Sequence, residues 1–221
     1  MNRRLGFHLG LAAGALLSIS SAFAAPLPFT DGFEGFSSTQ LNTPPDGWAA
    51  LFGTVDSVHS GDYSITCASG SGCVDLDGST KDSALLLSSD TFDLHAGQQY
   101  QLTFDLSGNQ RNSSSDSVNF GINDAITNGQ LAFGTTTVAG GAGFTTYSLI
   151  FTAATDAAAY IFFSSFGANN NDNVGAVLDN VSLTAVPIPA AGWLLISGLV
   201  GLVGVARRRK SGGAMEAVAA A

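Results

Sequence analysis

Apolar and polar residues alternate with a period of two along several stretches of this chain. The clearest stretch is 99–107 (QYQLTFDLS), where Tyr100, Leu102, Phe104 and Leu106 take one face and Gln101, Thr103 and Asp105 take the other. Similar runs occupy 117–122, 146–152, 158–165 and 175–183. Clusters of Gly, Asn, Asp and Ser separate these runs, and no amphipathic helix of useful length is visible. The pattern predicts an all-β protein with a single antiparallel β-sandwich.

The first 24 residues differ from the rest of the chain. Arg3 and Arg4 precede an apolar stretch at 9–19, and the segment ends with the small residues Ala22 and Ala24. A basic start, a short apolar centre and small residues two positions apart are the three parts of a secretory signal peptide. We therefore predict cleavage after residue 24 during export by the general secretion machinery. A short N-terminal membrane anchor is the alternative.

A second apolar segment lies near the C-terminus. Residues 190–206 carry no charge, and their number is at the lower limit for a membrane-spanning helix. Arg207, Arg208 and Arg209 follow directly. Basic residues stay on the cytoplasmic side of a membrane, so the two ends together predict an exported body with a C-terminal transmembrane helix. The alternative is a buried helix of the globular domain.

Residues 186–210 resemble the PEP-CTERM sorting signal, which joins a Pro-x-Pro motif, a short apolar span and a basic end. Val186, Pro187 and Pro189 carry the motif here. The resemblance implies that an exosortase, a membrane protease, cuts at the motif and passes the protein outward. It also implies a precursor anchored in the inner membrane of a Gram-negative bacterium, with its body in the periplasm. The processed protein would then lie at the cell surface or in an exopolysaccharide-rich biofilm matrix.

The domain organisation that follows is a signal peptide at 1–24, a β-sandwich at 25–185, the sorting signal at 186–210 and a short disordered tail at 211–221. The body is strongly acidic. Its only basic residues are Lys81 and Arg111, against 15 Asp and the single Glu34, which gives a net charge of −14 over residues 25–186. Such a surface repels nucleic acid, so we exclude nucleic acid as a partner.

Four segments of the body resemble the galactose-binding-like jelly rolls that are common among PEP-CTERM proteins. They are CVDLDGST (73–80), LTFDLSGNQR (102–111), FTTYSLIFTA (144–153) and NVGAVLDNVSL (173–183). The resemblance implies a jelly-roll sandwich like those of carbohydrate-binding modules and of plant cell-wall domains of unknown function. It implies a fold more than a ligand, because one such fold serves many functions.

The same resemblance implies a structural calcium ion where the N- and C-terminal strands meet. The matching residues are Asp31, Glu34 and Asp179. Asp179 falls in phase with Val177, Val181 and Leu183, and a carboxylate on an apolar face is costly unless it is paired or binds a cation. Calcium takes six to eight oxygen ligands, so backbone carbonyls would complete the shell. Alternatively, Asp179 caps a bulge or accepts hydrogen bonds from backbone N–H groups.

Cys67 and Cys73 are the only cysteines, and five small residues separate them. Export would place them in an oxidising compartment, so we predict a disulfide. The alternative is two free thiols. A zinc site would need two further ligands at suitable spacing, and none is nearby.

The sequence contains no recognisable catalytic motif. We therefore predict a protein that is not an enzyme and that binds polysaccharide through Trp48, Asn109 and Arg111. Aromatic faces stack on sugar rings, and amide and guanidinium groups bind hydroxyls. The alternatives are that Trp48 anchors a loop to the core and that Arg111 pairs with a nearby Asp. At the level of function, the alternative is a purely structural or adhesive matrix protein, and a glycoside-acting enzyme is the least favoured.

Overall fold

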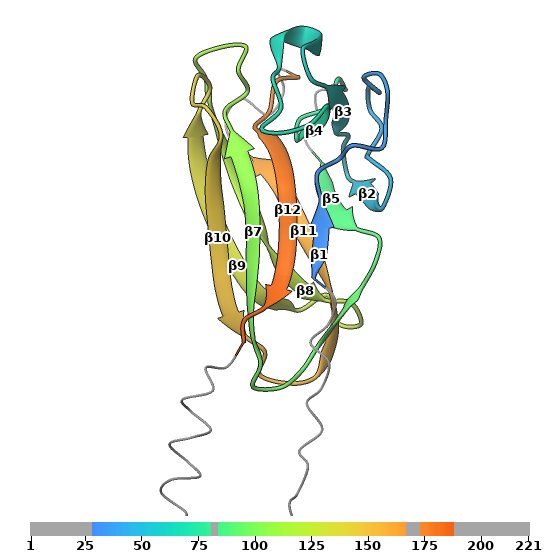
Figure 1. Cartoon of the computed structure of the whole chain (residues 1–221), viewed down its shortest axis with the longest axis vertical. Helices are drawn as coiled ribbons and strands as arrows, with labels where there is room; N and C mark the ends of the chain where they lie inside the picture. The colour runs from blue at the N-terminus through green and yellow to red at the C-terminus, as the bar shows by residue number, and fades with distance from the viewer. Residues whose placement is uncertain (1–27, 81–83, 167–172, 188–221) are drawn as a thin grey trace, which may run out of the picture.

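A computed structural model describes residues 28–80, 84–166 and 173–187 of the chain. These residues form two antiparallel sheets packed face to face (Figure 1). The first sheet has the order β10 (Thr145–Thr152), β7 (Gln99–Ser107), β12 (Val177–Ala185), β4 (Gly72–Asp75) and β3 (Asp56–His59), and β1 (Phe29–Asp31) also pairs with β12. The second sheet has the order β2 (Trp48–Leu51), β5 (Leu85–Ser88), β11 (Ala157–Phe166), β8 (Ser115–Asp124) and β9 (Gln130–Ala139), and β6 (Phe92–Leu94) also pairs with β11.

The core confirms the predicted alternation. Strand β7 covers residues 99–107, and the four apolar side chains of its predicted inner face are at most 1% exposed. Phe104 on this strand makes edge-to-face contacts with Phe120 and Phe163 of the second sheet, with ring centroids 4.7 and 5.0 Å apart. Burying one such ring stabilises the fold by about 1.5–3 kcal/mol. The predicted all-β sandwich is therefore the observed fold.

A β-bulge in β12 corrects one sequence-based prediction. The register between β12 and β7 shifts between Asp179 and Ser182, and Asn180 between them has a positive φ of 51°. Val181 lies in the main core, whereas Val177 packs in a second cluster on the other side of the sheet. Asp179 is therefore in phase with Val177 but not with Val181 or Leu183, because one extra residue in a bulge reverses the alternation.

The two ends of the described chain lie side by side. Phe29 of β1 is opposite Leu183 of β12, and toward the bottom of Figure 1 β1 begins where β12 ends. The last hydrogen bonds of the sandwich involve Val186, whose N–H donates to Gln99 O at 2.8 Å and whose carbonyl accepts from Gln98 Nε2 at 2.7 Å.

The predicted signal peptide (1–24), the apolar span (190–206) and the tail (211–221) lie outside the described residues, as do Pro189 and the basic end, Arg207 to Arg209. Within the described ranges, no helix is long and apolar enough to cross a membrane. The sorting-signal predictions therefore stay predictions.

Candidate functional site

The outward positions of five of the six strands of the second sheet carry no charged side chain, whereas the sixth, β6, carries the exposed Asp93. Strands β2, β5, β8, β9 and β11 contain only two charged residues, Asp116 and Asp124 at the two ends of β8. Asp116 is buried and accepts a hydrogen bond from Asn109, and Asp124 accepts N–H bonds from the turn that follows β8. We call the outward-facing positions of these five strands the neutral face.

An apolar row crosses this neutral face. Leu87, Phe162, Gly121 and Phe133 are paired in register across β5, β11, β8 and β9. A Cβ on Gly121 would come within 2.9 Å of the Phe162 ring, so the glycine allows this ring to lie against β8. Phe162 is almost fully buried, whereas Phe133 at the end of the row is 46% exposed.

Amide and hydroxyl side chains flank the apolar row. Asn119 and Ser164 lie two positions along their strands from Gly121 and Phe162, and they are paired with each other. On the opposite flank, Tyr160 is paired with Asn123, whose Nδ2 donates to the tyrosine hydroxyl at 3.3 Å. The face therefore combines apolar rings with uncharged hydrogen-bonding groups.

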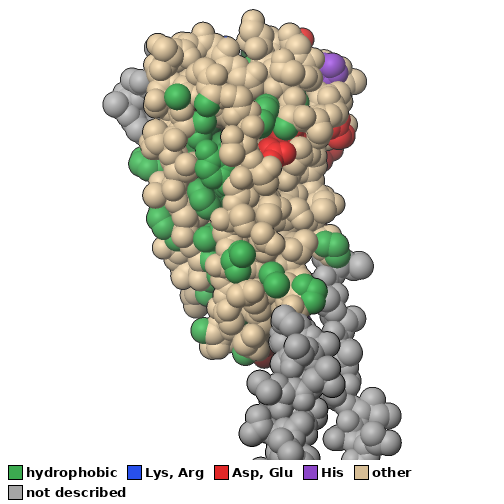
Figure 2. All heavy atoms as spheres, turned by 60° about the vertical axis from the view of Figure 1, so that its left-hand side comes forward, with side chains coloured by type: hydrophobic (Ala, Val, Ile, Leu, Met, Phe, Trp, Pro, Cys, Tyr) green, Lys and Arg blue, Asp and Glu red, His purple; other side chains and the backbone are tan. Residues whose placement is uncertain are grey.

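Figure 2 shows a side of the sandwich on which apolar side chains form a vertical run. No Lys or Arg is visible among its coloured residues, although acidic side chains and a histidine appear near its upper part.

A hollow of about 640 Å³ lies at one end of the first sheet. Its walls are the disulfide loop at 66–68, the turn at 141–144 and the side chains of Asp105, Gln110 and Thr146. Gln110 holds the loop in place, because its side-chain amide accepts from Thr66 N and donates to Thr66 O, both at 3.0 Å. The hollow is polar and open, and its volume is typical of small-ligand sites.

The predicted disulfide between Cys67 and Cys73 is present. Two carboxylates hold the loop that it closes. Asp179 accepts hydrogen bonds from Ala68 N and Ser69 N at 2.9 and 3.1 Å. Burial raises the pKa of Asp179 to about 6, although these N–H bonds favour its charged form.

Glu34 binds the same loop from the other side. Its Oε2 accepts from the N–H and the hydroxyl of Ser71 at 2.7 and 2.8 Å. These hydrogen bonds lower the pKa of Glu34 below its usual value. The carboxylates of Asp179 and Glu34 thus fix the disulfide loop through its backbone.

Asp31, the third predicted calcium ligand, binds Trp48 instead. Its Oδ2 accepts from the indole Nε1 at 2.7 Å, and its Oδ1 accepts from Phe33 N at 2.8 Å. Among the residues that the structure describes, no three His, Cys, Asp or Glu side chains are grouped as metal ligands. Asp31, Glu34 and Asp179 therefore do not form the predicted shared site, because each bonds separate backbone or side-chain donors. Calcium binding by the chain stays a prediction.

Trp48 lies in the core rather than on a surface. It is 5% exposed, and its ring packs between Phe33 and Phe163 at centroid distances of 5.7 and 6.0 Å. The alternative prediction, a tryptophan that anchors its loop to the core, agrees with this arrangement. A sugar could not stack on this ring without a rearrangement of the loop.

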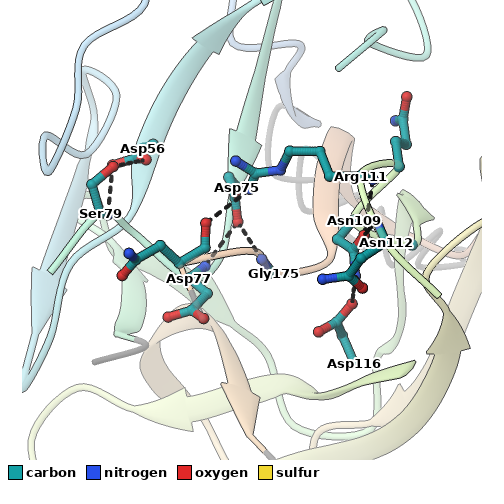
Figure 3. Close-up of polar contacts among 12 residues, drawn as sticks. Asp56, Asp75, Asp77, Ser79, Asn109, Arg111, Asn112, Asp116 and Gly175 are labelled. Atoms are coloured by element: carbon teal, nitrogen blue, oxygen red, sulfur yellow. Dashed lines mark hydrogen bonds and ion pairs between the residues drawn. The ribbon is translucent and has the colours of Figure 1, made fainter. Parts of the chain in front are cut away.

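Arg111 and Asn109 belong to a buried polar network (Figure 3). Arg111 forms an ion pair with Asp75, which is 1% exposed and also accepts from the N–H groups of Asp77 and Gly175 at 3.0 and 2.9 Å. Burial raises the pKa of Asp75 well above its usual value, while Arg111 opposes this rise. The alternative for Arg111, pairing with an Asp, is the one observed.

Asn109 is fully buried in the same network, where its Nδ2 donates to Asp116 Oδ2 at 3.0 Å. Of the three predicted sugar ligands, Trp48 and Asn109 are therefore buried, and Arg111, whose side chain is 22% exposed, is held in its ion pair with Asp75. The neutral face was missed by sequence reasoning, although its signal was present. Phe162 and Phe133 stand at the outward positions of alternating strands, where polar residues are the usual choice.

A family model described as "Protein of unknown function (DUF642)" matches residues 28–184. A search of curated proteins finds no match to the chain. The fold is similar to the CBM22-1 xylan-binding domain of Paenibacillus barcinonensis Xyn10C, with a TM-score of 0.50 and 14% identity over 76% of this chain and 99% of that domain.

The fold of this chain is also similar to parts of two larger structures. The CBM22-1–CBM22-2 tandem of the same xylanase has a TM-score of 0.52 and 13% identity, covering 76% of this chain and 48% of that one. An arabinose-bound GH51 α-L-arabinofuranosidase has a TM-score of 0.54 and 13% identity, and the match spans 71% of this chain but only 26% of the enzyme. At these identities the similarity concerns the fold alone.

Proposed function

We propose that this chain, which belongs to the DUF642 family, is a non-catalytic module that binds a neutral polysaccharide on its neutral face. The observation that carries the proposal is the apolar row from Leu87 to Phe133, flanked by Asn, Ser and Tyr side chains without any charge. Phe133 is the accessible ring of this row, whereas Phe162, which is 5% exposed, supports the row from below. Sugar rings present C–H faces that pack against aromatic and aliphatic side chains, and their hydroxyls bind amides and hydroxyls. The face offers both kinds of group in register.

The size and charge of the face favour a polymer. Five strands spaced about 4.8 Å apart span about 19 Å, which is the length of several sugar residues. The body has a net charge of −14, so it repels acidic polymers, whereas a neutral glycan meets no such barrier. The likeness in fold to a xylan-binding domain supports xylan as the first polysaccharide to test.

Binding of the purified full chain to soluble xylan, measured by isothermal titration calorimetry, tests the proposal. We expect binding to xylan and none to polygalacturonate, an acidic polymer of similar length. Phe133→Ala should raise the Kd about tenfold, the effect of losing one well-packed contact. Ile150→Ala is the matched control, because Ile150 is 55% exposed but lies on the first sheet.

Two outcomes would refute the proposal. One is no binding to xylan, mixed-linkage glucan or galactomannan. The other is equal loss of affinity in the Phe133 and Ile150 variants. The first outcome would favour the second candidate, a structural or adhesive matrix protein without a specific glycan.

The sorting signal completes the proposed role. The fold and the disulfide support an exported protein, since disulfides persist in oxidising compartments. We propose that an exosortase removes the tail at the motif and that the body then associates with exopolysaccharide at the cell surface. The sandwich makes its last hydrogen bonds at Val186, so a cut just beyond this residue would leave the fold intact. Mass spectrometry of surface material should show a C-terminus within residues 186–190, and a surface protein that ends at Ala221 would contradict this.

A further inference from the structure

Phe52 is an aromatic residue held both in an unfavourable backbone conformation and in water. Its φ is 66°, in the left-handed region that a bulky side chain rarely adopts. Its side chain is 90% exposed, the largest fraction among the exposed large apolar residues that the structure describes. Gly or Asn would suit this backbone better, and a polar side chain would suit water better. A residue that serves the fold so poorly points to a contact outside the molecule.

The chain on both sides of Phe52 is fixed. Leu51 is paired with Leu85 at the end of β2. Two residues after Phe52, the carbonyl of Thr54 accepts the N–H of Gly78 at 2.9 Å. The backbone that carries the Phe52 ring is therefore held by contacts on both sides. Binding of a partner to this ring would cost little additional conformational entropy of the backbone.

Phe52 follows the edge strand of the sheet that carries the neutral face. β2 is the edge strand of the second sheet, and Leu51, 44% exposed, is an outward-facing residue of that sheet. Phe52 is the next residue along the chain, so it lies at the edge of the second sheet opposite to β9, which carries Phe133, and its left-handed backbone ends the alternation of β2.

We propose that Phe52 is a ligand-contacting residue that extends the neutral face and packs against one sugar ring of the bound neutral polysaccharide. This inference rests on the proposed function. The neighbouring sugar rings of the same polysaccharide then lie across β5, β11 and β8, and Phe133 contacts the other end of the polysaccharide segment. An acidic membrane surface is a poor partner for Phe52, because the body carries a net charge of −14.

Three variants of the full chain test this role with soluble xylan as the probe. Phe52→Asn keeps a side chain that tolerates the left-handed backbone and removes the ring. Phe52→Tyr keeps the ring. Tyr63→Asn is the matched control, because Tyr63 is also exposed and has a φ of 51°, but it lies in the 3₁₀ turn η1 (Asp62–Ser64) between β3 and β4 of the first sheet.

We expect Phe52→Asn to raise the Kd for xylan about tenfold while Phe52→Tyr binds as the wild type does. Both Asn variants should keep or raise the melting temperature, by about 2–4 °C where backbone strain is relieved. Tyr63→Asn should leave the Kd unchanged. A loss of affinity together with unchanged or higher thermal stability separates a ligand contact from a structural role.

The outcomes distinguish this inference from the proposed function. Unchanged xylan affinity in Phe52→Asn, together with weakened binding in Phe133→Ala, would overturn the role of Phe52 alone. Absence of glycan binding by the wild type would overturn both. A dimer of the wild type that Phe52→Asn converts to a monomer in light scattering would also overturn the inference, because the ring would then contact a second copy.

Discussion

Replacing Arg111 by Met should destabilise the sandwich strongly at neutral pH and only weakly in acid. Asp75 is 1% exposed, and the guanidinium is its only cationic partner among the described residues. Met fills a similar volume but leaves the buried carboxylate with two backbone N–H groups alone. Removing one partner of a buried ion pair costs about 3–5 kcal/mol of unfolding free energy. For a domain of this size, such a loss lowers the melting temperature by about 10 °C.

The pH dependence follows from the pKa of Asp75. Burial raises this pKa well above the usual 3.8, and Arg111 opposes the rise. A carboxyl group with a raised pKa stabilises the folded state fully below pH 3.8, and that contribution is lost as pH rises toward the folded pKa. Without Arg111 the pKa rises further, so the difference between variant and wild type should grow between pH 4 and pH 7.

Urea unfolding followed by tryptophan fluorescence measures this difference, because Trp48 is buried in the folded protein. Arg111→Lys is the control that keeps the positive charge and should cost less at both pH values. Adding Asp75→Asn to Arg111→Met should recover part of the stability at pH 7, since no uncompensated charge remains. A loss below about 1 kcal/mol at pH 7, or an equal loss at pH 4 and pH 7, would refute this account of the ion pair.

Three further predictions concern the disulfide loop and its carboxylates. The pKa of Asp179 is about 6 instead of 3.8, so its contribution to stability should fall as pH rises from about 4 to 6, by at most about 3 kcal/mol in total, and Asp179→Asn should flatten this slope in urea unfolding between pH 4 and pH 7. Replacing Cys67 and Cys73 by Ser should lower the unfolding free energy by at most about 2–3 kcal/mol, because the closed loop is short and hydrogen bonds from other elements also hold it. Loss of the native fold when both cysteines are replaced by Ser, judged by near-UV circular dichroism, would contradict this small effect of the disulfide. If calcium binds at Asp179, millimolar calcium should raise the melting temperature more than magnesium does, and Asp179→Asn should abolish the difference, whereas an equal rise with both ions would contradict this site and reflect screening of the acidic body alone.

The sequence alone determined the fold class and five of its strands, β7, β8, β10, β11 and β12. The period-two pattern of 99–107 placed β7 and its buried face correctly, because alternation is a local property of an extended chain. The cysteine spacing predicted the disulfide for a similar reason, since a loop of small residues can close on itself. Both signals lie within a few neighbouring residues and need no knowledge of distant strands.

The alternation pattern predicted the wrong face for Asp179, because one extra residue in β12 shifts its register with β7. Asp179 has the spacing of an inward-facing residue relative to Val181, yet the bulge at Asn180 turns it toward the disulfide loop more than 100 positions earlier in the chain. The sequence kept open the alternative that Asp179 caps a bulge or accepts backbone N–H bonds, and Asn180 suits a left-handed backbone. The position of the bulge is fixed by the pairing with β7 and by the backbone N–H groups of Ala68 and Ser69.

The tertiary structure also decided which aromatic rings meet water. Trp48 and Phe52 lie four positions apart, and the sequence left open whether Trp48 binds sugar or anchors its loop to the core. The structure buries Trp48 against Phe33 and Phe163 and leaves Phe52 90% exposed. Burial is set by what packs over a side chain, and here the covering residues come from strands and loops distant in sequence. The neutral face exists for the same reason, because strands from four separate parts of the chain must pair before its rings form one row.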